Sequence, residues 1–434
     1  MARIAVVGSG IGGLAAVWTL SARGHRVTVY EAQPRLGMDA HAVDVAGARG
    51  EVRIDVPMRV FFPEYYPKLV GLYDDAGVGF ETLDYSGSFG SLGGELYFKY
   101  RTYPLAGAAW PFLDRRAINA DVVRLGVEVV SFLSRLRLQP PSPESLDGVT
   151  FEAFLDGFGC SDRLRWRFLM PLFAAICTCS YASLAMYPAR TIVGYLASVM
   201  SAVRMRRVTL GVRHVVETLS SGAEAIRLAS PVRSLRRTPS GVEVEDHRGH
   251  SDRFDHVVLA TQANQALSIL GHRAAAEERA ALTAFGYEAF EVVTHTDRRL
   301  APAREQWWSP VNFLLGRESR APMATILMNP IHRGLGDAEP VLQTWNPLLE
   351  PAPERVYSRV RLERPLVDRA TLVGQRMLQE LHGQAGRKIW FCGSYASAGV
   401  PLQESAVTSA LEIARLVPVD GGPAGPAQGL RRNF

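Results

Sequence analysis

Residues 4–31 read IAVVGSGIGGLAAVWTLSARGHRVTVYE: an apolar strand, a glycine turn, a small-residue helix and a second strand that ends in an acid. Gly8, Gly10 and Gly13 make a G-x-G-x-x-G turn. The first glycine permits the tight turn, the second lets the backbone approach a pyrophosphate, and the third lets helix and strand pack closely. The helix N-terminus favours negative charge, and Glu31 follows at the offset expected for ribose hydroxyls. The stretch therefore predicts an adenine-dinucleotide site.

The residues after Glu31 indicate which dinucleotide. Arg35-Leu36-Gly37 follows the acid, and this pattern resembles the FAD-dependent superfamily of amine oxidases, phytoene desaturases and protoporphyrinogen oxidases. In those flavoproteins an Arg-x-Gly-Gly segment wraps the FAD pyrophosphate. Met38 stands where relatives have the second glycine.

The far end of the chain matches the same superfamily independently. Residues 388–395 read KIWFCGSY, an apolar strand that reaches Gly393, and residues 399–414 open a small-residue helix. The resemblance implies a helix N-terminus aimed at the isoalloxazine, where its dipole stabilises charge on the reduced ring. Ser394 stands where many relatives have Asp.

A third match lies between the two ends. Residues 241–246 alternate apolar and polar, which favours a half-solvated antiparallel ribbon, whereas residues 254–261 form a continuous apolar run typical of a central strand. The resemblance is greatest to a bacterial group of predicted NAD/FAD-binding amine-oxidase-like flavoproteins that often accompany lipid-modifying enzymes. It covers most of the chain, and Pro57 replaces the glycine of an Asp-x-Gly segment.

The resemblance implies non-covalent FAD held by a set of small, backbone-contacting or polar residues. These are Gly8, Gly10, Ile11, Gly12, Gly13, Glu31, Ala32, Arg35, Gly37, His41, Val232, Ala260, Gly393, Ser394, Pro401, Leu402 and Ser405.

The predicted fold class is α/β. We expect a discontinuous Rossmann-type, glutathione-reductase-like FAD-binding domain from residues 1–85, 205–270 and 384–417, and an α+β substrate-binding cap from residues 86–204 and 271–383. Residues 418–434 are rich in Gly, Pro and Ala and predict a disordered tail.

Composition excludes several classes. A chain of 434 residues with 47% hydrophobic and 21% charged residues fits a globular protein of two domains. No apolar run is long enough to span a bilayer, and a strand beginning by Ile4 leaves no room for a signal peptide, so a cytoplasmic location is expected. The four cysteines lack metal-ligand spacing, and the scattered arginines disfavour nucleic-acid binding. Contact with a membrane surface and the oligomeric state stay open.

Candidate catalytic residues are Tyr103, Trp345, Asn346 and Tyr395, chosen because they follow strands expected to meet at the flavin. Amine oxidases of this superfamily commonly use a lysine beside the flavin. This chain has only three lysines, of which Lys99 alone lies on an expected cap strand. Each candidate could instead have a structural role.

Dense groups of aromatic residues in the expected cap, such as Tyr97, Phe98 and Tyr100, favour a hydrophobic small-molecule substrate. Three functions remain in competition. The first is an FAD-dependent oxidoreductase of oxidase, dehydrogenase or desaturase type that acts by hydride transfer. The second is a flavin-dependent isomerase or cyclase without net redox change. The third is a lipid-binding or regulatory protein that retains FAD.

Overall fold

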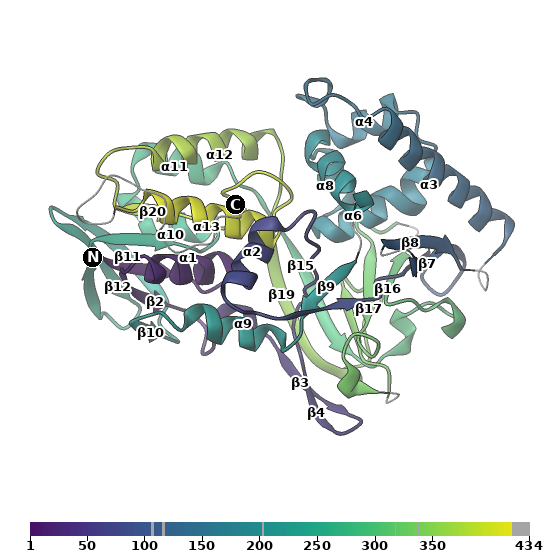
Figure 1. The fold of residues 1–434 in the computed structure, drawn as a ribbon, viewed down its shortest axis with the longest axis horizontal. Coiled ribbons are helices and arrows are strands. Elements are labelled where there is room, and N and C mark those ends of the chain that lie inside the picture. The colour runs from purple at the N-terminus through teal and green to yellow at the C-terminus, as the bar shows by residue number, and fades with distance from the viewer. Residues whose placement is uncertain (106–107, 115–117, 202–203, 317, 337–338, 419–434) are drawn as a thin grey trace.

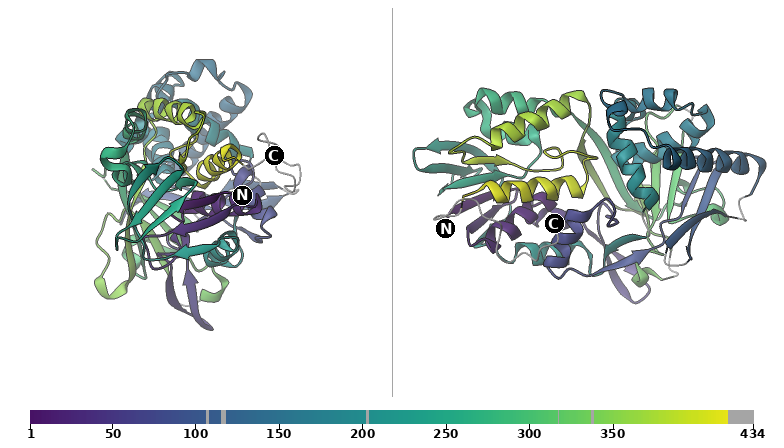
Figure 2. Two further views of the ribbon diagram at one scale, coloured as in Figure 1. Left: turned by 90° about the vertical axis from the view of Figure 1, so that its left-hand side faces the viewer. Right: turned by 45° about the horizontal axis from the view of Figure 1, so that its top comes forward.

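The computed structural model describes residues 1–105, 108–114, 118–201, 204–316, 318–336 and 339–418, and for residues 102–105, 108–112 and 201 the backbone alone. Tyr103 and the predicted tail from residue 419 onward therefore lie outside the described side chains. Figure 1 shows two lobes side by side, and Figure 2 gives the same lobes from two further directions.

The lobe that contains the N-terminus is built on a five-stranded parallel sheet in the order β10-β2-β1-β14-β20. Its strands come from distant parts of the chain: β1 Arg3–Val7, β2 Arg26–Tyr30, β10 Ala225–Arg227, β14 His256–Leu259 and β20 Ile389–Phe391. The continuous apolar run predicted as a central strand is confirmed as β14, which pairs with β1 on one side and β20 on the other.

Side chains of β1 alternate between two cores, because successive residues of a strand point to opposite faces. Ile4 and Val6 pack with α1, whereas Ala5 and Val7 pack with the opposite layer. On the first face lie α1 Ile11–Ala22, α9 Gly211–Ser220 and α13 Gln403–Leu416. On the second lie β11 Val232–Thr238, β12 Gly241–Asp246 and β13 Ser251–Phe254, with α10 Ala263–Leu270, α11 Ala276–Thr283 and α12 Arg369–His382. The sheet is thus buried on both faces, as a parallel sheet must be.

The second lobe contains an eight-stranded mixed sheet in the order β19-β15-β18-β17-β16-β6-β7-β8. Its strands are β6 Gly87–Ser91, β7 Leu96–Leu105, β8 Ala108–Leu113, β15 Tyr287–His295, β16 Val311–Leu315, β17 Met323–Leu327, β18 Leu342–Trp345 and β19 Val356–Pro365. One end of this sheet is covered by helices (Figure 1), namely α3 Ala120–Leu138, α4 Phe151–Gly157, α5 Asp162–Leu164, α6 Met170–Cys177, α7 Tyr181–Ala185 and α8 Ala189–Ser201.

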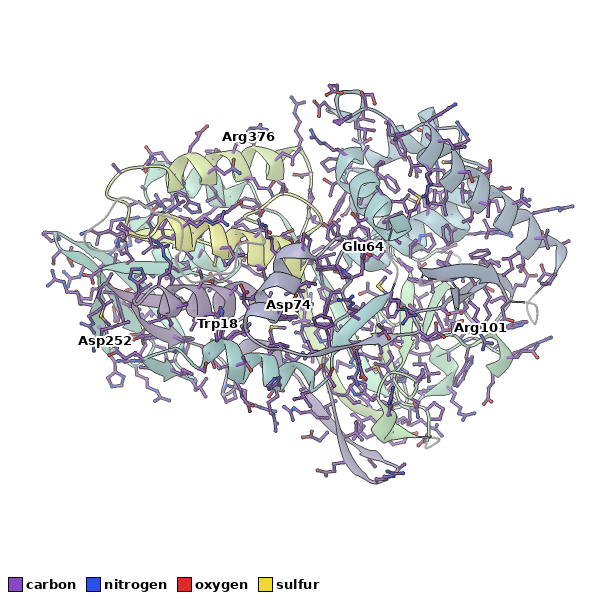
Figure 3. The ribbon with its side chains drawn as sticks, in the orientation of Figure 1. Trp18, Glu64, Asp74, Arg101, Asp252 and Arg376 are labelled. Carbon is purple, nitrogen blue, oxygen red and sulfur yellow. The ribbon has the colours of Figure 1, made fainter. Side chains whose placement is uncertain are left out.

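Smaller elements complete the described chain. They are helix α2 Pro67–Asp75, the hairpin of β3 Val43–Gly47 with β4 Gly50–Ile54, and the pair of β5 Phe80–Leu83 with β9 Met205–Val208. Charged side chains project outward, as Arg376 of α12 shows in Figure 3. The division into an FAD-binding domain and a cap stays a proposal, but α11 and α12, which lie inside the expected cap range 271–383, pack on the sheet of the first lobe.

No helix among the described residues is long and apolar enough to cross a membrane. The part of the chain that the structure describes also contains no group of three or more His, Cys, Asp or Glu side chains that could hold a metal ion.

The turn from β1 into α1 makes a stability prediction. A Cβ on Gly13 would lie 2.0 Å from the carbonyl oxygen of Gly8, a contact that only backbone movement could relieve. We expect Gly13→Ala to lower the free energy of unfolding by about 2 kcal/mol or more, because overpacking of a rigid site costs this much. Urea denaturation followed by circular dichroism measures it.

The matched control is Gly194→Ala in α8, where a Cβ would meet nothing within 4 Å. This change should leave stability unchanged or raise it by about 0.5–1 kcal/mol, because alanine is the better helix former. Equal stability of Gly13→Ala and the parent protein would contradict the close contact.

Candidate functional site

The glycine turn presents backbone N–H groups to a large cavity. Gly8 has a φ of +96°, a conformation that glycine adopts readily, and its N–H donates to the carbonyl oxygen of Tyr30 at 2.8 Å. No side chain caps α1 at Gly10, and a Cβ on Gly10 would meet nothing within 4 Å. Gly10, Ile11 and Gly12 line the cavity, so the first turn of α1 has both the open space and the uncapped donors that a pyrophosphate needs.

Glu31 is buried at the end of β2 and lines the same cavity. One carboxylate oxygen accepts from the backbone N–H of Ser9 at 3.1 Å and from the Ser9 hydroxyl, and the other accepts from the N–H of Gln33 at 2.9 Å. The Ser9 hydroxyl oxygen also accepts from the N–H of Gly37 at 2.7 Å. Ser9 therefore joins the glycine turn, the acid and the following segment, a role that sequence reasoning missed.

The segment after Glu31 supports the turn more than it lines the cavity. Ala32 lines the cavity, whereas Gly37 packs on Ser9, with a hypothetical Cβ only 2.9 Å from the Ser9 carbonyl oxygen. Arg35 is exposed, and neither it nor His41 lines the cavity. Burial, together with the nearby charge of Arg59, lowers the pKa of His41.

The remaining predicted FAD segments converge on the cavity from the other strands. Val232, Ala260, Gly393, Ser394, Pro401 and Leu402 all line it. Gln403, the first residue of α13, lines it as well and was not predicted. The Ser405 hydroxyl instead donates to the carbonyl oxygen of Val400 at 2.8 Å, so it stabilises the turn that precedes α13 and does not line the cavity.

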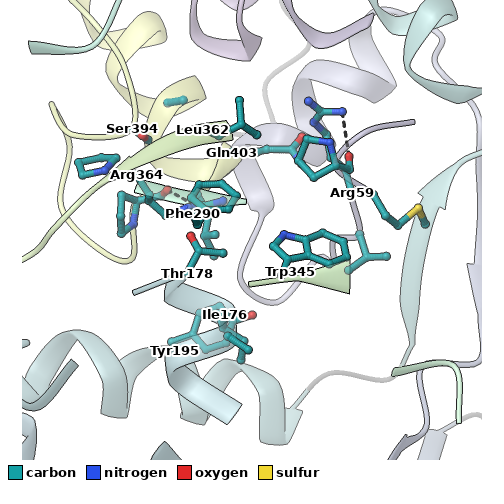
Figure 4. Close-up of a pocket in the computed structure, with 18 of the residues that line it drawn as sticks. Arg59, Ile176, Thr178, Tyr195, Phe290, Trp345, Leu362, Arg364, Ser394 and Gln403 are labelled. Carbon is teal, nitrogen blue, oxygen red and sulfur yellow. Dashed lines mark hydrogen bonds between the residues drawn. The ribbon is translucent and has the colours of Figure 1, made fainter. Parts of the chain in front are cut away.

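Of the candidate catalytic residues, some line the cavity and one does not. Trp345, at the end of β18, lines the cavity (Figure 4). Asn346 does not line it: its N–H donates to the Glu291 carbonyl oxygen at 2.9 Å, and its side-chain oxygen accepts from the Glu291 N–H at 3.3 Å. Asn346 thus ties β18 to β15, with a φ of +49°. Tyr395 borders the cavity, but its ring packs edge-on against Phe285 with centroids 4.8 Å apart.

The cavity has a volume of about 2140 Å³ and extends from the glycine turn into the second lobe. A site for a single small ligand typically measures roughly 300–1,000 Å³, so the space accommodates more than one. The part in the second lobe is mostly apolar and aromatic, and its lining includes Phe62, Tyr66, Tyr85, Phe98, Tyr100, Phe168, Leu172, Phe173, Ile176, Tyr195, Leu196, Val311, Phe313, Ile326 and Trp345.

The cavity reaches the surface beside α3. Val123, Val127 and Val130 line it and yet are 41%, 64% and 64% exposed. Their spacing places them on one face of the helix. Met200 of α8 also lines this region. These side chains form an apolar rim at the opening of the cavity. Large exposed apolar patches are uncommon on proteins and mark binding sites.

None of the three lysines lines the cavity. Lys99 is buried in an ion pair with Asp114 at 3.2 Å, and its ammonium donates to the carbonyl oxygen of Gln306 at 2.7 Å. Lys388 donates to the carbonyl oxygen of Pro239, and Lys68 lies on α2. The only cations among the described lining residues are Arg59, Arg137 and Arg364, none of which was predicted.

Glu31 makes the sharpest test of the dinucleotide site. We expect Glu31→Ala to weaken FAD binding about ten- to a hundredfold, because a hydrogen bond to a charged group contributes ~1.5–3 kcal/mol. Titration of the apoprotein with FAD, followed by tryptophan fluorescence, measures the dissociation constant. Glu224→Ala, which removes an exposed carboxylate at the edge of the same sheet, should leave it unchanged. Unaltered affinity in Glu31→Ala would show that the carboxylate serves the protein alone.

Known proteins resemble this chain at two levels. Residues 6–76 match a family of NAD(P)-binding Rossmann-like domains. A carotenoid phi-ring synthase from Streptomyces griseus is 33% identical over 159 residues, which are 35% of this chain and 30% of that protein. The chain thus spans less than a third of the curated relative that it matches.

Solved structures extend the likeness to the whole fold. Putrescine oxidase bound to putrescine is 17% identical with a TM-score of 0.62, and cyclohexylamine oxidase from Brevibacterium oxydans IH-35A is 16% identical with a TM-score of 0.62. Each comparison covers 95% of this chain and 98% of the other. Residues 6–76 are thus similar to NAD(P)-binding Rossmann-like domains, and the described chain has a fold like that of these two oxidases, as the resemblance in its sequence predicted.

Proposed function

We propose that the protein is an FAD-dependent oxidoreductase that takes a hydride from a hydrophobic small molecule. One observation carries the proposal: the glycine turn, the turn before α13 and the apolar and aromatic part of the cavity in the second lobe belong to one continuous cavity. We call that part of the cavity the chamber. A dinucleotide on the first two features would place its redox-active end beside the third. The fold of two amine oxidases and the name of the carotenoid phi-ring synthase support it.

The residues present fit FAD. The uncapped N-terminus of α1, the open space at Gly10 and the buried carboxylate of Glu31 suit the pyrophosphate and ribose. The turn before α13 and the helix N-terminus at Gln403 suit the isoalloxazine. When bound, the flavin would accept the hydride, and the protein supplies orientation and exclusion of water.

The chamber walls favour an uncharged substrate. Phe290, Leu362 and Trp345 border the junction between the cofactor segments and the chamber (Figure 4). Apolar walls of this kind exclude water and hold a substrate by burial of its apolar surface, worth about 25 cal/mol per Å².

The chamber has few candidate bases: the carboxylate that lines the cavity beside Leu362 is Glu363 of β19. Among its described lining residues no histidine or lysine occurs, and burial raises the pKa of Tyr100 to about 12. Burial also raises the pKa of Tyr66 and of Tyr195, so these phenols stay protonated at neutral pH and can donate hydrogen bonds. The lysine-assisted oxidation of amines therefore has no lysine to perform it among the described residues that line the cavity.

The cofactor is tested first. We expect the purified protein to be yellow and to release all of its flavin, as intact FAD, on acid or heat precipitation, because the site holds it by hydrogen bonds and helix dipoles. Chromatography and mass spectrometry of the supernatant identify it. Colour that stays in the pellet would contradict non-covalent binding, and recovery of NAD would remove the proposed function.

The reaction is tested with the holoprotein under anaerobic conditions. Loss of oxidised-flavin absorbance with polyenes or long-chain alkyl substrates, and none with putrescine, is the expected result. A product of unchanged mass without net flavin reduction would instead identify an isomerase or cyclase. If no compound is converted and the flavin is never reduced, the protein is one that retains FAD for a structural or regulatory purpose.

The apolar rim predicts how the substrate enters. We expect Val127→Asp to raise the dissociation constant of the uncharged probe N-phenyl-1-naphthylamine about tenfold, which corresponds to ~1.4 kcal/mol of lost apolar contact. Val373→Asp is the matched control, since Val373 is exposed on α12 and does not line the cavity. Equal probe affinity in both variants would show that the α3 face is no entrance.

A further inference from the structure

Two arginines face the cavity without a carboxylate partner. Arg59 donates from Nη1 to the carbonyl oxygen of Pro57 at 3.1 Å, and Arg364, near the end of β19, donates from Nη1 to the carbonyl oxygen of Pro401 at 3.0 Å. Among the described residues no carboxylate oxygen forms an ion pair with either guanidinium. Asp55 attracts Arg59 from beyond ion-pair distance, and its own carboxylate accepts from the N–H of Val212.

Three other arginines with little exposed surface are paired with acids, whereas the half-buried Arg23 is not paired with any described acid. Arg387 pairs with Glu278 at 3.0 Å, Arg207 with Glu81 at 2.6 Å, and Arg53 with Asp39 at 2.9 Å. This contrast matters because a charge removed from water without a partner costs several kcal/mol. Arg59 and Arg364 are the described cations that line the deep part of the cavity, and neither has such an ion pair.

The charges of these two arginines act on each other and on the same space. Burial lowers the pKa of both guanidinium groups, and the positive charge of Arg364 lowers that of Arg59 further. Both side chains are half-buried and border the cavity. Guanidinium groups stay protonated in proteins, so two mutually repelling charges border one cavity, where an anion would stabilise them.

The position of Arg59 and Arg364 in the cavity indicates which anion they would bind. Pro401, which accepts from Arg364, lies two residues before the first residue of α13, Gln403. In Figure 4, Arg364 lies near Ser394, Arg59 lies on the opposite side of the view, and Gln403 lies between them. The positive end of the α13 dipole adds to the two charges. The chamber beyond, bordered by Trp345, is apolar, so the positive charge is concentrated where the cofactor segments meet the chamber.

We propose that Arg59 and Arg364 hold the negative charge that the isoalloxazine acquires on reduction. The inference rests on the proposed function. Removal of a hydride breaks one C–H bond of the substrate and delivers two electrons and one proton to the ring, which gains one negative charge. The substrate is oxidised by two electrons and becomes neutral again by releasing one further proton to water. Planar guanidinium groups match such a delocalised, planar anion better than an ammonium does.

The test measures the FAD-loaded protein by two readouts other than turnover, the midpoint potential and the dissociation constant of sulfite, which adds a negative charge to oxidised flavin. We expect Arg59→Gln and Arg364→Gln each to lower the preference for the reduced ring at least tenfold, or about 30 mV for a two-electron couple, and to weaken sulfite binding at least tenfold. Arg59→Lys and Arg364→Lys should stay within threefold of the parent protein.

Arg137→Gln is the matched control. It removes an arginine from the lining of the same cavity, but on α3, far from α13 in Figure 1. Both readouts should equal those of the parent protein. A similar shift in this variant would mean that the cavity responds to net charge, and the assignment to Arg59 and Arg364 would be wrong.

If a glutamine variant loses its FAD, the proposal can still be tested on the apoprotein. The apoprotein is then titrated separately with oxidised and with dithionite-reduced FAD, and the affinity for the reduced form must fall at least tenfold more than that for the oxidised form. Unchanged potential and sulfite affinity would overturn the proposal. So would unchanged potential with weaker binding of dodecanoate, since the anion would then be a substrate carboxylate. Absence of FAD from the parent protein would instead refute the proposed function.

Discussion

The contact between Gly13 and the carbonyl oxygen of Gly8 is the constraint on which the rest of the site depends. It lets α1 begin directly behind β1, with its uncapped N-terminus turned into the cavity. A side chain at Gly13 would push the helix away from the strand and misdirect those N–H groups. Ser9 and Glu31 then stabilise the turn from the other side, since each hydrogen-bonds to a neighbour across the loop.

Parallel pairing extends this local geometry to distant parts of the chain. Because β14 and β20 run parallel to β1, the residues that follow them lie at the same edge as the glycine turn. Ala260 and Gly393 reach the cavity for this reason, although they are far from Gly8 in the chain. The turn after β20 then places the start of α13 beside the second lobe (Figure 1).

The cavity combines two environments that rarely suit the same ligand. Near α13 it has two arginines and a helix N-terminus, whereas beyond Trp345 its walls are aromatic and aliphatic. A cofactor that becomes charged and a substrate that stays apolar would each find a matching surface. The burial of Lys99 in an ion pair outside the cavity separates this arrangement from one based on a lysine.

The sequence by itself determined the dinucleotide half of the protein. Glycine spacing, an acid at the end of the second strand and apolar runs are local patterns, and their physical requirements (a φ of +96° at Gly8, no room for a Cβ at Gly13) act over a few residues. Tertiary structure decided which other side chains reach the cavity. Trp345 and Asn346 are adjacent, yet only Trp345 lines it, because the backbone of Asn346 turns to bond with Glu291. Arg59 and Arg364 carry no local signature, since only the folded chain brings both of them to the lining of one cavity.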